Sequence, residues 1–414
     1  MRGARPRRPV KGAPGNREAG KTRAVALLVA AEVLAMALWF TASATLADLV
    51  AETGMSPARA ALLSSAVAAG FVVGALGIAI TGLADRLDPR RVFAAAGLAA
   101  ALANALPLVV APDGALGVAA RAAVGLCLAG VYPVGMKIAV GWGLRDRGLL
   151  VGLLVGGLTL GSAAPHLLAF LGGADWRTTT LAASALAAAG AALVLATSLG
   201  PHHARAPRFD ARAATLAWSD VSIRRAFAGY LGHMWELYAM WAWIGTALAA
   251  SYALRMDPAE AAPRAKLTAF AAIAVGAVLC PVAGAFADRV GKARLTVLAM
   301  AASGAAALAA AATFGGPAWL FAAVVVVWGA AIIPDSAQFS ALVADAAPPD
   351  RAGSLLTLQT ALGFALTVAT VQALPSVVEA IGWRASFVVL ALGPAVGIVS
   401  VLPLARAERA ARRG

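Results

Sequence analysis

The chain has 414 residues, of which 61% are hydrophobic and 13% are charged, and its formal net charge is +14. An average soluble domain has about 45–50% apolar and about 25% charged residues, so this composition excludes a soluble globular protein. The two cysteines lie in apolar segments, which excludes a disulfide framework and a zinc-ligand cluster, and we expect no metal and no cofactor.

Twelve apolar stretches follow one another along the chain, each close to the length that crosses a bilayer as a helix. They lack the period-two alternation of barrel strands, so helices are expected. Their approximate ranges are 24–46, 58–81, 92–110, 115–136, 149–170, 178–199, 226–250, 267–286, 295–313, 318–341, 354–374 and 384–404. The sequence therefore predicts an all-α membrane protein with twelve transmembrane helices.

Polar segments divide the chain. Residues 1–22 are basic and lack apolar periodicity, which predicts a disordered cytosolic tail, and residues 406–414 form a second cytosolic tail. Residues 200–225 predict a cytosolic linker between an N-terminal bundle at 23–199 and a C-terminal bundle at 226–405.

With both termini inside, six basic residues fall in the outer loops: Arg59, Arg177, Arg255, Arg264, Lys266 and Arg384. This positive-inside bias predicts the inner (plasma) membrane and no nucleic-acid partner.

The first span carries a carboxylate, Glu32, that hydrophobicity alone would not place there. Met36 and Trp39 share its helical stripe, and the fourth span contains Arg121. A charge at mid-bilayer costs about 2.5–3.5 kcal/mol on insertion scales, so such residues usually face a cavity. Burial favours the protonated carboxylate and an approaching arginine favours the ionised one, which is a mechanism for proton coupling. A static ion pair between Glu32 and Arg121 is the alternative.

The seventh span repeats this pattern. Glu236 lies near its middle, and His233, Met240 and Trp243 lie on the matching stripe. The two segments read EVLAMALW and ELYAMWAW. We predict a substrate cavity lined by these side chains, with ordinary helix packing as the alternative.

Polar side chains also interrupt the tenth and eleventh spans. Asp335 follows Pro334 and precedes Gln338 by three residues, and Gln359 lies in the eleventh span. We predict that Asp335 takes part in proton coupling and that both glutamines line the cavity. The alternatives are a local bond from Asp335 to backbone freed by the proline, and satisfied hydrogen bonds between helices for the glutamines.

An offset of about 204 residues superposes the two halves, since Glu32 falls on Glu236 and Trp176 falls near Trp383. Two loops at matched positions read TGLADRLDPRR and GAFADRVGKAR. Both resemble the G-x-L-A-D-R-x-G-R-K signature of the major facilitator superfamily, although Thr81 and Asp88 depart from it in the first copy.

The resemblance implies a conformational latch whose acid meets a helix N-terminus, a contact that stabilises by about 0.3–1 kcal/mol. Its residues would be Asp85, Arg86, Arg90, Asp288, Arg289 and Lys292. Ordinary basic loops are the alternative. The resemblance further implies the major facilitator fold, two pseudo-symmetric six-helix bundles with helices one, four, seven and ten around the cavity. Those helices carry the four coupling candidates Glu32, Arg121, Glu236 and Asp335.

Together these features predict a proton-coupled secondary transporter that moves a small organic solute by alternating access. We expect its partners to be the substrate, protons and the lipid bilayer, and we expect a monomer. A proton-driven efflux antiporter for cationic or aromatic compounds is one alternative, and a non-transporting receptor on the same fold is another. An enzyme is not expected, because the scattered histidines and cysteines supply no catalytic constellation.

Overall fold

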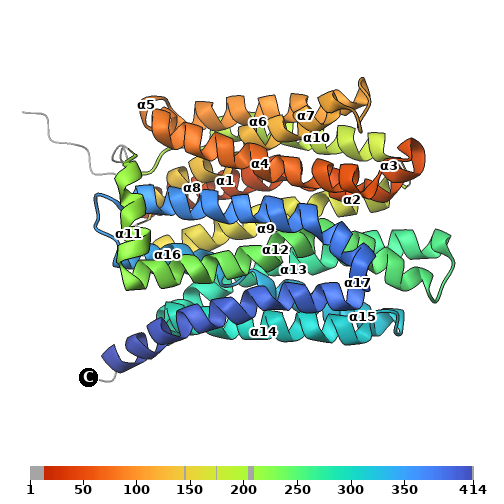
Figure 1. Ribbon diagram of the computed structural model, residues 1–414. Coiled ribbons are helices and arrows are strands. Elements are labelled where there is room, and N and C mark those ends of the chain that lie inside the picture. The colour runs from red at the N-terminus through yellow and green to blue at the C-terminus, as the bar shows by residue number, and fades with distance from the viewer. Residues whose placement is uncertain (1–13, 144–145, 174, 204–208, 413–414) are drawn as a thin grey trace, which may run out of the picture.

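The helices run side by side in two groups, one from each half of the sequence (Figure 1). The computed structural model describes residues 14–412 apart from 144–145, 174 and 204–208, and the side chains of residues 14–17 and of Asp288 are not described. Among the residues that it does describe, nine helices are long and apolar enough to span a bilayer. The fold is that of a multi-pass helical membrane protein, and the number of crossings stays a prediction.

The first group contains the segments of the predicted N-terminal bundle. Its helices are α1 (Pro14–Met36), α2 (Thr41–Ala44), α3 (Leu46–Thr53), α4 (Pro57–Thr81), α5 (Leu83–Arg86), α6 (Pro89–Ala105), η1 (Leu106–Leu108), α7 (Ala115–Leu128), α8 (Tyr132–Val140), α9 (Arg147–Leu171), α10 (Trp176–Leu193) and η2 (Val194–Ala196). The predicted linker contains two short helices, η3 (Ala211–Ala213) and α11 (Ala214–Ser219).

The second group contains α12 (Val221–Ala253), α13 (Pro258–Val290), α14 (Lys292–Thr313), α15 (Ala318–Ile332), α16 (Ser336–Ala346) and α17 (Ala352–Ala411). The last of these has 60 residues and bends at Gly382, where φ is 76° and ψ is 168°. Glycine adopts a positive φ readily because it has no Cβ. The bend divides α17 into two limbs, and the predicted eleventh and twelfth spans fall on separate limbs.

Local signals in the sequence explain several helix boundaries. The Ser56 side chain accepts a hydrogen bond from Arg59 N at the start of α4, Pro57 occupies the first turn, and Gly82 ends the helix with a φ of 64°. At α6 the Asp88 side chain accepts from Arg90 N. A side-chain acceptor before the first turn satisfies a free backbone donor. Asp88, which departs from the loop signature, is therefore the N-cap of α6.

Among the described residues, the predicted first, fourth and tenth spans are each interrupted by a short stretch that is not helical. The interruptions lie between α1 and α2 at residues 37–40, between α7 and α8 at residues 129–131, and between α15 and α16 at residues 333–335. A break leaves backbone carbonyl groups without their helical partners, and these need new donors where no water is present. Three of the candidate functional residues belong to these interrupted segments: Glu32, Arg121 and Asp335.

Two pairs of helices join the halves, α4 with α17 and α9 with α13. Small residues allow the second pair to approach closely. A Cβ on Gly156 would lie 2.6 Å from the carbonyl oxygen of Ala277, and a Cβ on Gly152 would lie 2.9 Å from Cα of Pro281. Backbones that pack through glycine in this way are common between membrane helices.

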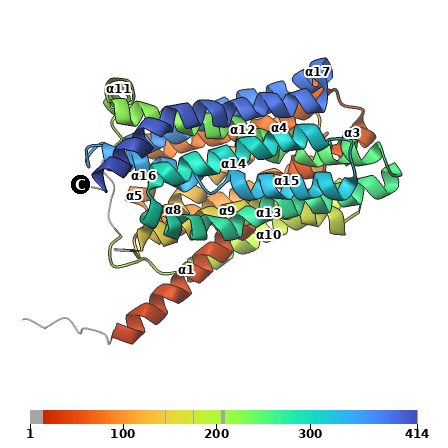
Figure 2. The ribbon, with the colours of Figure 1, turned by 90° about the horizontal axis from the view of Figure 1, so that it is seen from below.

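The ends of the chain differ from the prediction. The tail predicted as disordered over 1–22 is helical from Pro14, and α1 extends away from the bundle (Figure 2). Its Lys21 forms an ion pair with Asp146, which fixes this extension. At the other terminus α17 continues through Ala411, so residues 406–411 of the predicted tail are helical as well.

The two ends of the bundle are named by their predicted orientation. The inner end is the one predicted to face the cytosol, and it holds Asp85, Asp146 and Lys292. The outer end is the opposite one.

Candidate functional site

Glu32 is buried between three helices and has no partner. Its exposed fraction is 0%, and neither carboxylate oxygen has a hydrogen-bond partner among the described residues. Glycines make room for it, since a Cβ on Gly135 of α8 would lie 2.7 Å from Oε2 and a Cβ on Gly157 of α9 would lie 3.6 Å from Cγ. An ionised carboxylate without a partner is costly in such a place, so this site suits the neutral acid.

The glycines of α9 also bring Glu32 close to the opposite half. Gly157 lies beside Glu32, and a Cβ on the neighbouring Gly156 would lie 2.6 Å from the carbonyl oxygen of Ala277 in α13. Glu32 therefore lies close to the surface along which the two halves meet.

Arg121 does not pair with Glu32 in this structure. Its guanidinium donates from Nη2 to the carbonyl oxygen of Trp39 at 2.7 Å, from both Nη atoms to that of Leu38 at 3.2 Å, and from Nη1 to Oδ1 of Asn104 at 2.8 Å. These carbonyl groups belong to the break after α1. The predicted static ion pair is therefore wrong for this conformation, and Arg121 satisfies the backbone groups that the broken first span releases.

Glu236 is buried like Glu32 but is fully bonded. Ser303 Oγ of α14 donates to Oε2 at 2.6 Å, and Trp328 Nε1 of α15 donates to Oε1 at 2.8 Å. Both donors are in the C-terminal half. Two acids at equivalent positions of the repeat thus differ, because one has two fixed donors and the other has none.

Asp335 and His233 form a second buried acidic site. Asp335 Oδ1 lies 3.0 Å from His233 Nδ1, with side-chain exposed fractions of 3% and 1%. The approach does not have the geometry of a hydrogen bond, and neither Oδ1 nor His233 Nε2 has a hydrogen-bond partner in the described part of the chain. Asp335 precedes α16 but makes no side-chain cap bond there, so the predicted bond to nearby backbone is not formed.

An aromatic cluster joins the halves above Glu32 on the outer side. Trp39 lies 5.5 Å from Tyr238 and 5.3 Å from Phe364, measured between ring centroids, and Phe71 lies 4.5 Å from Phe364. Phe40 completes the cluster against Tyr238 at 6.0 Å. Trp39 and Phe40 lie in the break after α1. The cluster therefore closes the middle of the bundle between the acids and the outer end.

The other predicted cavity residues are buried around this centre. Met36 packs against Gly161 of α9, and Trp243 Nε1 donates to the carbonyl oxygen of Val371 at 3.0 Å. The remaining three are also buried: Met240, Gln338 and Gln359. Gln359 Nε2 has no hydrogen-bond partner among the described residues, so one amide is available to a ligand.

The predicted latch residues lie at the inner end, with partners that the sequence did not reveal. Asp85 forms an ion pair with Lys137 of α8, and Arg90 pairs with Asp88 at 2.7 Å. The hydrogen bond from Arg90 lowers the pKa of the Asp88 carboxyl. Arg86 is exposed.

In the second copy of the latch, Lys292 Nζ lies 2.5 Å from Asp345 Oδ2, and Arg289 is exposed. The N-terminus of α14 is met by Glu408, whose Oε1 accepts from Lys292 N at 2.9 Å. The acid expected there is Asp288, but its side chain lies outside the described residues.

At the outer end, side-chain bonds join the two halves directly. Lys266 of α13 pairs with Asp48 of α3 at 2.9 Å, and Ser65 of α4 bonds Gln372 of α17 at 2.9 Å. Gln372 also donates to the carbonyl oxygen of Ala58 at 3.3 Å. These contacts close the outer end in this conformation.

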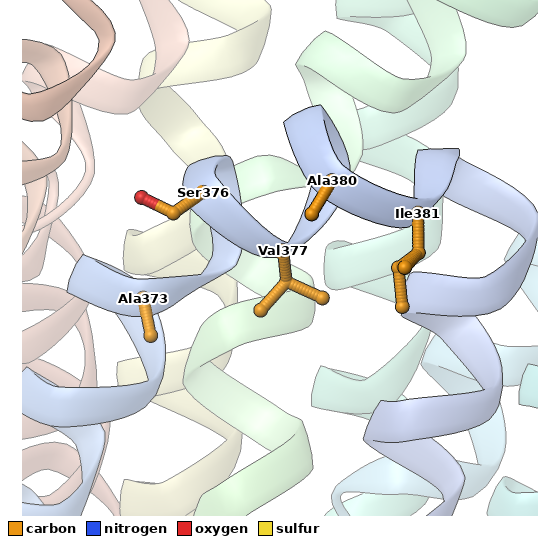
Figure 3. Close-up of a pocket in the computed structure, with 5 residues that line it drawn as sticks. All are labelled: Ala373, Ser376, Val377, Ala380 and Ile381. Atoms are coloured by element: carbon orange, nitrogen blue, oxygen red, sulfur yellow. The ribbon is translucent and has the colours of Figure 1, made fainter.

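One hollow lies away from this centre (Figure 3). It measures about 440 Å³ and is lined by five residues of α17: Ala373, Ser376, Val377, Ala380 and Ile381. All five come from one helix, and the single hydroxyl among them offers little for recognition. We assign this hollow to the lipid-facing surface and place the functional centre at the buried acids. Among the described residues, no cluster of His, Cys, Asp or Glu could hold a metal ion.

Fold and site together define a multi-pass helical membrane protein with ionisable residues buried at its centre. Over residues 28–371 the chain matches the family described as the Major Facilitator Superfamily, so it belongs to that family and is a transporter rather than an enzyme. No curated protein matches the chain in sequence.

Three solved structures share the fold at low sequence identity. A mutant of the nucleoside transporter NupG has a TM-score of 0.69 and 17% identity over 92% of this chain and 99% of its own. The xylose transporter XylE from E. coli, in a partially occluded inward-open conformation, has a TM-score of 0.70 and 12% identity over 93% and 97%. A D-xylose-proton symporter has a TM-score of 0.69 and 13% identity over 91% and 95%.

Proposed function

We propose that this protein is a proton-coupled secondary transporter of a small organic solute and that Glu32 carries the coupled proton. The observation that carries the proposal is the state of the Glu32 carboxylate, which is fully buried and whose two oxygens find no hydrogen-bond partner in the described part of the chain. A group of this kind binds a proton when it is enclosed and releases it when a conformational change brings water or a cation to it.

The position of Glu32 supports this role. It lies beside α8, just after the break that follows α7, and beside Gly157 of α9, the helix that packs against α13 of the other half. Glu32 has no donor among the described residues, whereas Glu236 has two in its own half, so a donor or water brought by movement of the halves would act on Glu32 first. Asp335 with His233 is the second candidate for proton binding. The likeness to a D-xylose-proton symporter agrees with proton coupling.

The test is proton movement in proteoliposomes that contain a trapped pH-sensitive dye. D-xylose, uridine and ethidium are added in turn, as a sugar, a nucleoside and an aromatic cation. We expect one of these classes to move protons in the wild type and Glu32→Gln to abolish that movement, while exchange of labelled for unlabelled substrate continues. Exchange needs no net proton transfer, so it separates lost coupling from lost folding.

The matched control is Glu379→Gln, which neutralises an exposed carboxylate on α17. It should leave both activities unchanged. Full proton movement in Glu32→Gln would assign the coupling to another group. Binding of a probe with no flux of any kind would instead favour a non-transporting receptor.

One observation favours the second candidate, an efflux antiporter for cationic or aromatic compounds. Arg121 is held by carbonyl groups near Trp39, so it leaves the carboxylate of Glu32 without a compensating charge. The aromatic cluster of Trp39, Tyr238 and Phe364 lies on the same side, and aromatic faces attract cations. Proton movement with ethidium, and none with D-xylose or uridine, would favour this function.

A further inference from the structure

Arg121 also lines a small cavity inside the N-terminal half, separate from the centre described above. The cavity measures about 30 Å³ and lies among α2, α3, α6, α7 and α10. Its polar lining consists of Arg121, Asn104, Thr41, Thr45, Thr180 and Trp176. About 10–15 Å³ of such space holds one water molecule, so this cavity has room for a small ion or about two waters and is too small for an organic solute.

Within the part of the chain that the structure describes, no carboxylate balances the charge of Arg121. The side chain is 4% exposed and a guanidinium stays protonated in proteins, yet its bonds to described residues go to the oxygens of Leu38, Trp39 and Asn104. Its Nε has no partner among the described residues. A buried charge without an opposite charge is costly, which favours an anion beside it.

Two acids of α3, the helix that contributes Leu49 to the lining, are already paired with cations. Glu52 accepts from both Nη atoms of Arg177, at 2.6 and 2.7 Å, and from Nε1 of Trp176 at 2.9 Å. Asp48 on the same short helix pairs with Lys266. Neither acid compensates Arg121, and neither leaves a free negative charge that would repel an entering anion.

We propose that this cavity binds a chloride-sized monovalent anion at Nε of Arg121. The threonine hydroxyls can rotate to donate, although those of Thr41 and Thr45 now bond carbonyl groups of their own segment. The same guanidinium holds the carbonyl groups of Leu38 and Trp39. Anion binding therefore stabilises the broken form of the first span, and through Trp39 it stabilises the aromatic cluster.

The first test measures the melting temperature of the purified protein at constant ionic strength in sodium chloride, sodium bromide and sodium gluconate. We expect a saturable rise with chloride and bromide and none with gluconate, which is too large for the cavity. Thr180→Val, which keeps the shape of the side chain and removes a hydroxyl from the lining, should need about tenfold more chloride, the loss expected for one hydrogen bond to an ion. Thr296→Val, a buried threonine of α14 in the other half, should respond as the wild type does.

The second test looks for bromide directly, as an anomalous scattering peak beside Arg121 in crystals grown in sodium bromide. A peak there that is lost in Arg121→Gln supports the site, and the Thr180→Val titration remains informative if Arg121→Gln does not fold. Equal melting temperatures in chloride and gluconate, or equal chloride responses of Thr180→Val and the wild type, would overturn the proposal. Water alone would then fill the cavity.

Discussion

Lys266 Nζ lies 2.9 Å from Asp48 Oδ2, and this ion pair joins the two halves at the outer end. The side chains are only 13% and 12% exposed. Lys266 also donates to the carbonyl oxygen of Gly173 at 3.0 Å, so one ammonium group links α13 to two segments of the other half. A pair that is this well buried is less screened by salt than a surface pair, and removing one partner leaves the other charge buried without compensation.

We expect Asp48→Asn to weaken closure of the outer end. Loss of the pair should shift the equilibrium toward the outward-open state by roughly tenfold, which corresponds to about 1.4 kcal/mol. The measurement is the distance between spin labels on α3 and α13 by electron paramagnetic resonance. Glu260→Gln is the control, since it removes an exposed pair within α13 with side-chain exposures of 60% and 61%, and such pairs contribute little. Unchanged distances in Asp48→Asn would show that packing alone closes this end.

Glu236→Gln should reduce stability and leave proton coupling intact. Glutamine offers one acceptor oxygen, so the bond from Trp328 can stay while the Ser303 hydroxyl must turn and accept from the amide N–H instead of donating to a carboxylate. The expected loss is about 0.5–1.5 kcal/mol, the net contribution of one hydrogen bond. Melting curves and dye-loaded proteoliposomes give the two readouts. Ser303→Ala removes one donor and keeps the carboxylate, and it should show a similar loss of stability. Retained stability with lost coupling would instead make Glu236 a proton carrier.

The outer contact between α3 and α10 should be stable to mild acid. The hydrogen bonds of Arg177, and next that of Trp176, lower the pKa of Glu52 from 4.5 to about 2. A lowered folded-state pKa adds stability above the unfolded value, and this contribution is lost as the pH falls toward the folded value.

The difference in melting temperature between the wild type and Glu52→Gln should thus be constant above pH 4.5 and should shrink between pH 4.5 and 2. Adding Arg177→Gln to Glu52→Gln should change the curve little, because the partner is already gone. A difference that shrinks at higher pH would show that the contact does not hold the carboxylate ionised.

The lengths of the apolar segments predicted a helical membrane protein correctly, because insertion of a helix into a bilayer depends on the composition of a short stretch of sequence. The fifth span, predicted at 149–170, is α9 (Arg147–Leu171), and the ninth, predicted at 295–313, is α14 (Lys292–Thr313). Family membership, suggested by two short loops, is confirmed over most of the chain. Burial of Glu32 and Glu236 followed from their place in apolar runs.

The partners of the buried charges could not be predicted. No glycine or proline marks the break after Met36, so nothing local indicated that carbonyl groups would need Arg121. Asn104, a lone amide in the third apolar run, was the one available signal for that network. Lys137 pairs with Asp85, which lies more than 50 residues away in sequence. Contacts between residues far apart in the chain depend on how the helices pack against one another, and this packing cannot be deduced from a single sequence.

The aromatic cluster also bears on how well the protein would block the passage of protons across the membrane. Trp39, Tyr238 and Phe364 fill the space on the outer side of Glu32 with rings that cannot relay protons along a chain of water. The proton-carrying role proposed for Glu32 requires that protons do not cross the protein without substrate, since such a leak would dissipate the gradient that drives transport. The rings that close the path between the halves would also keep water, and with it protons, away from the outer side of Glu32, so smaller side chains at these positions should make the protein leak protons.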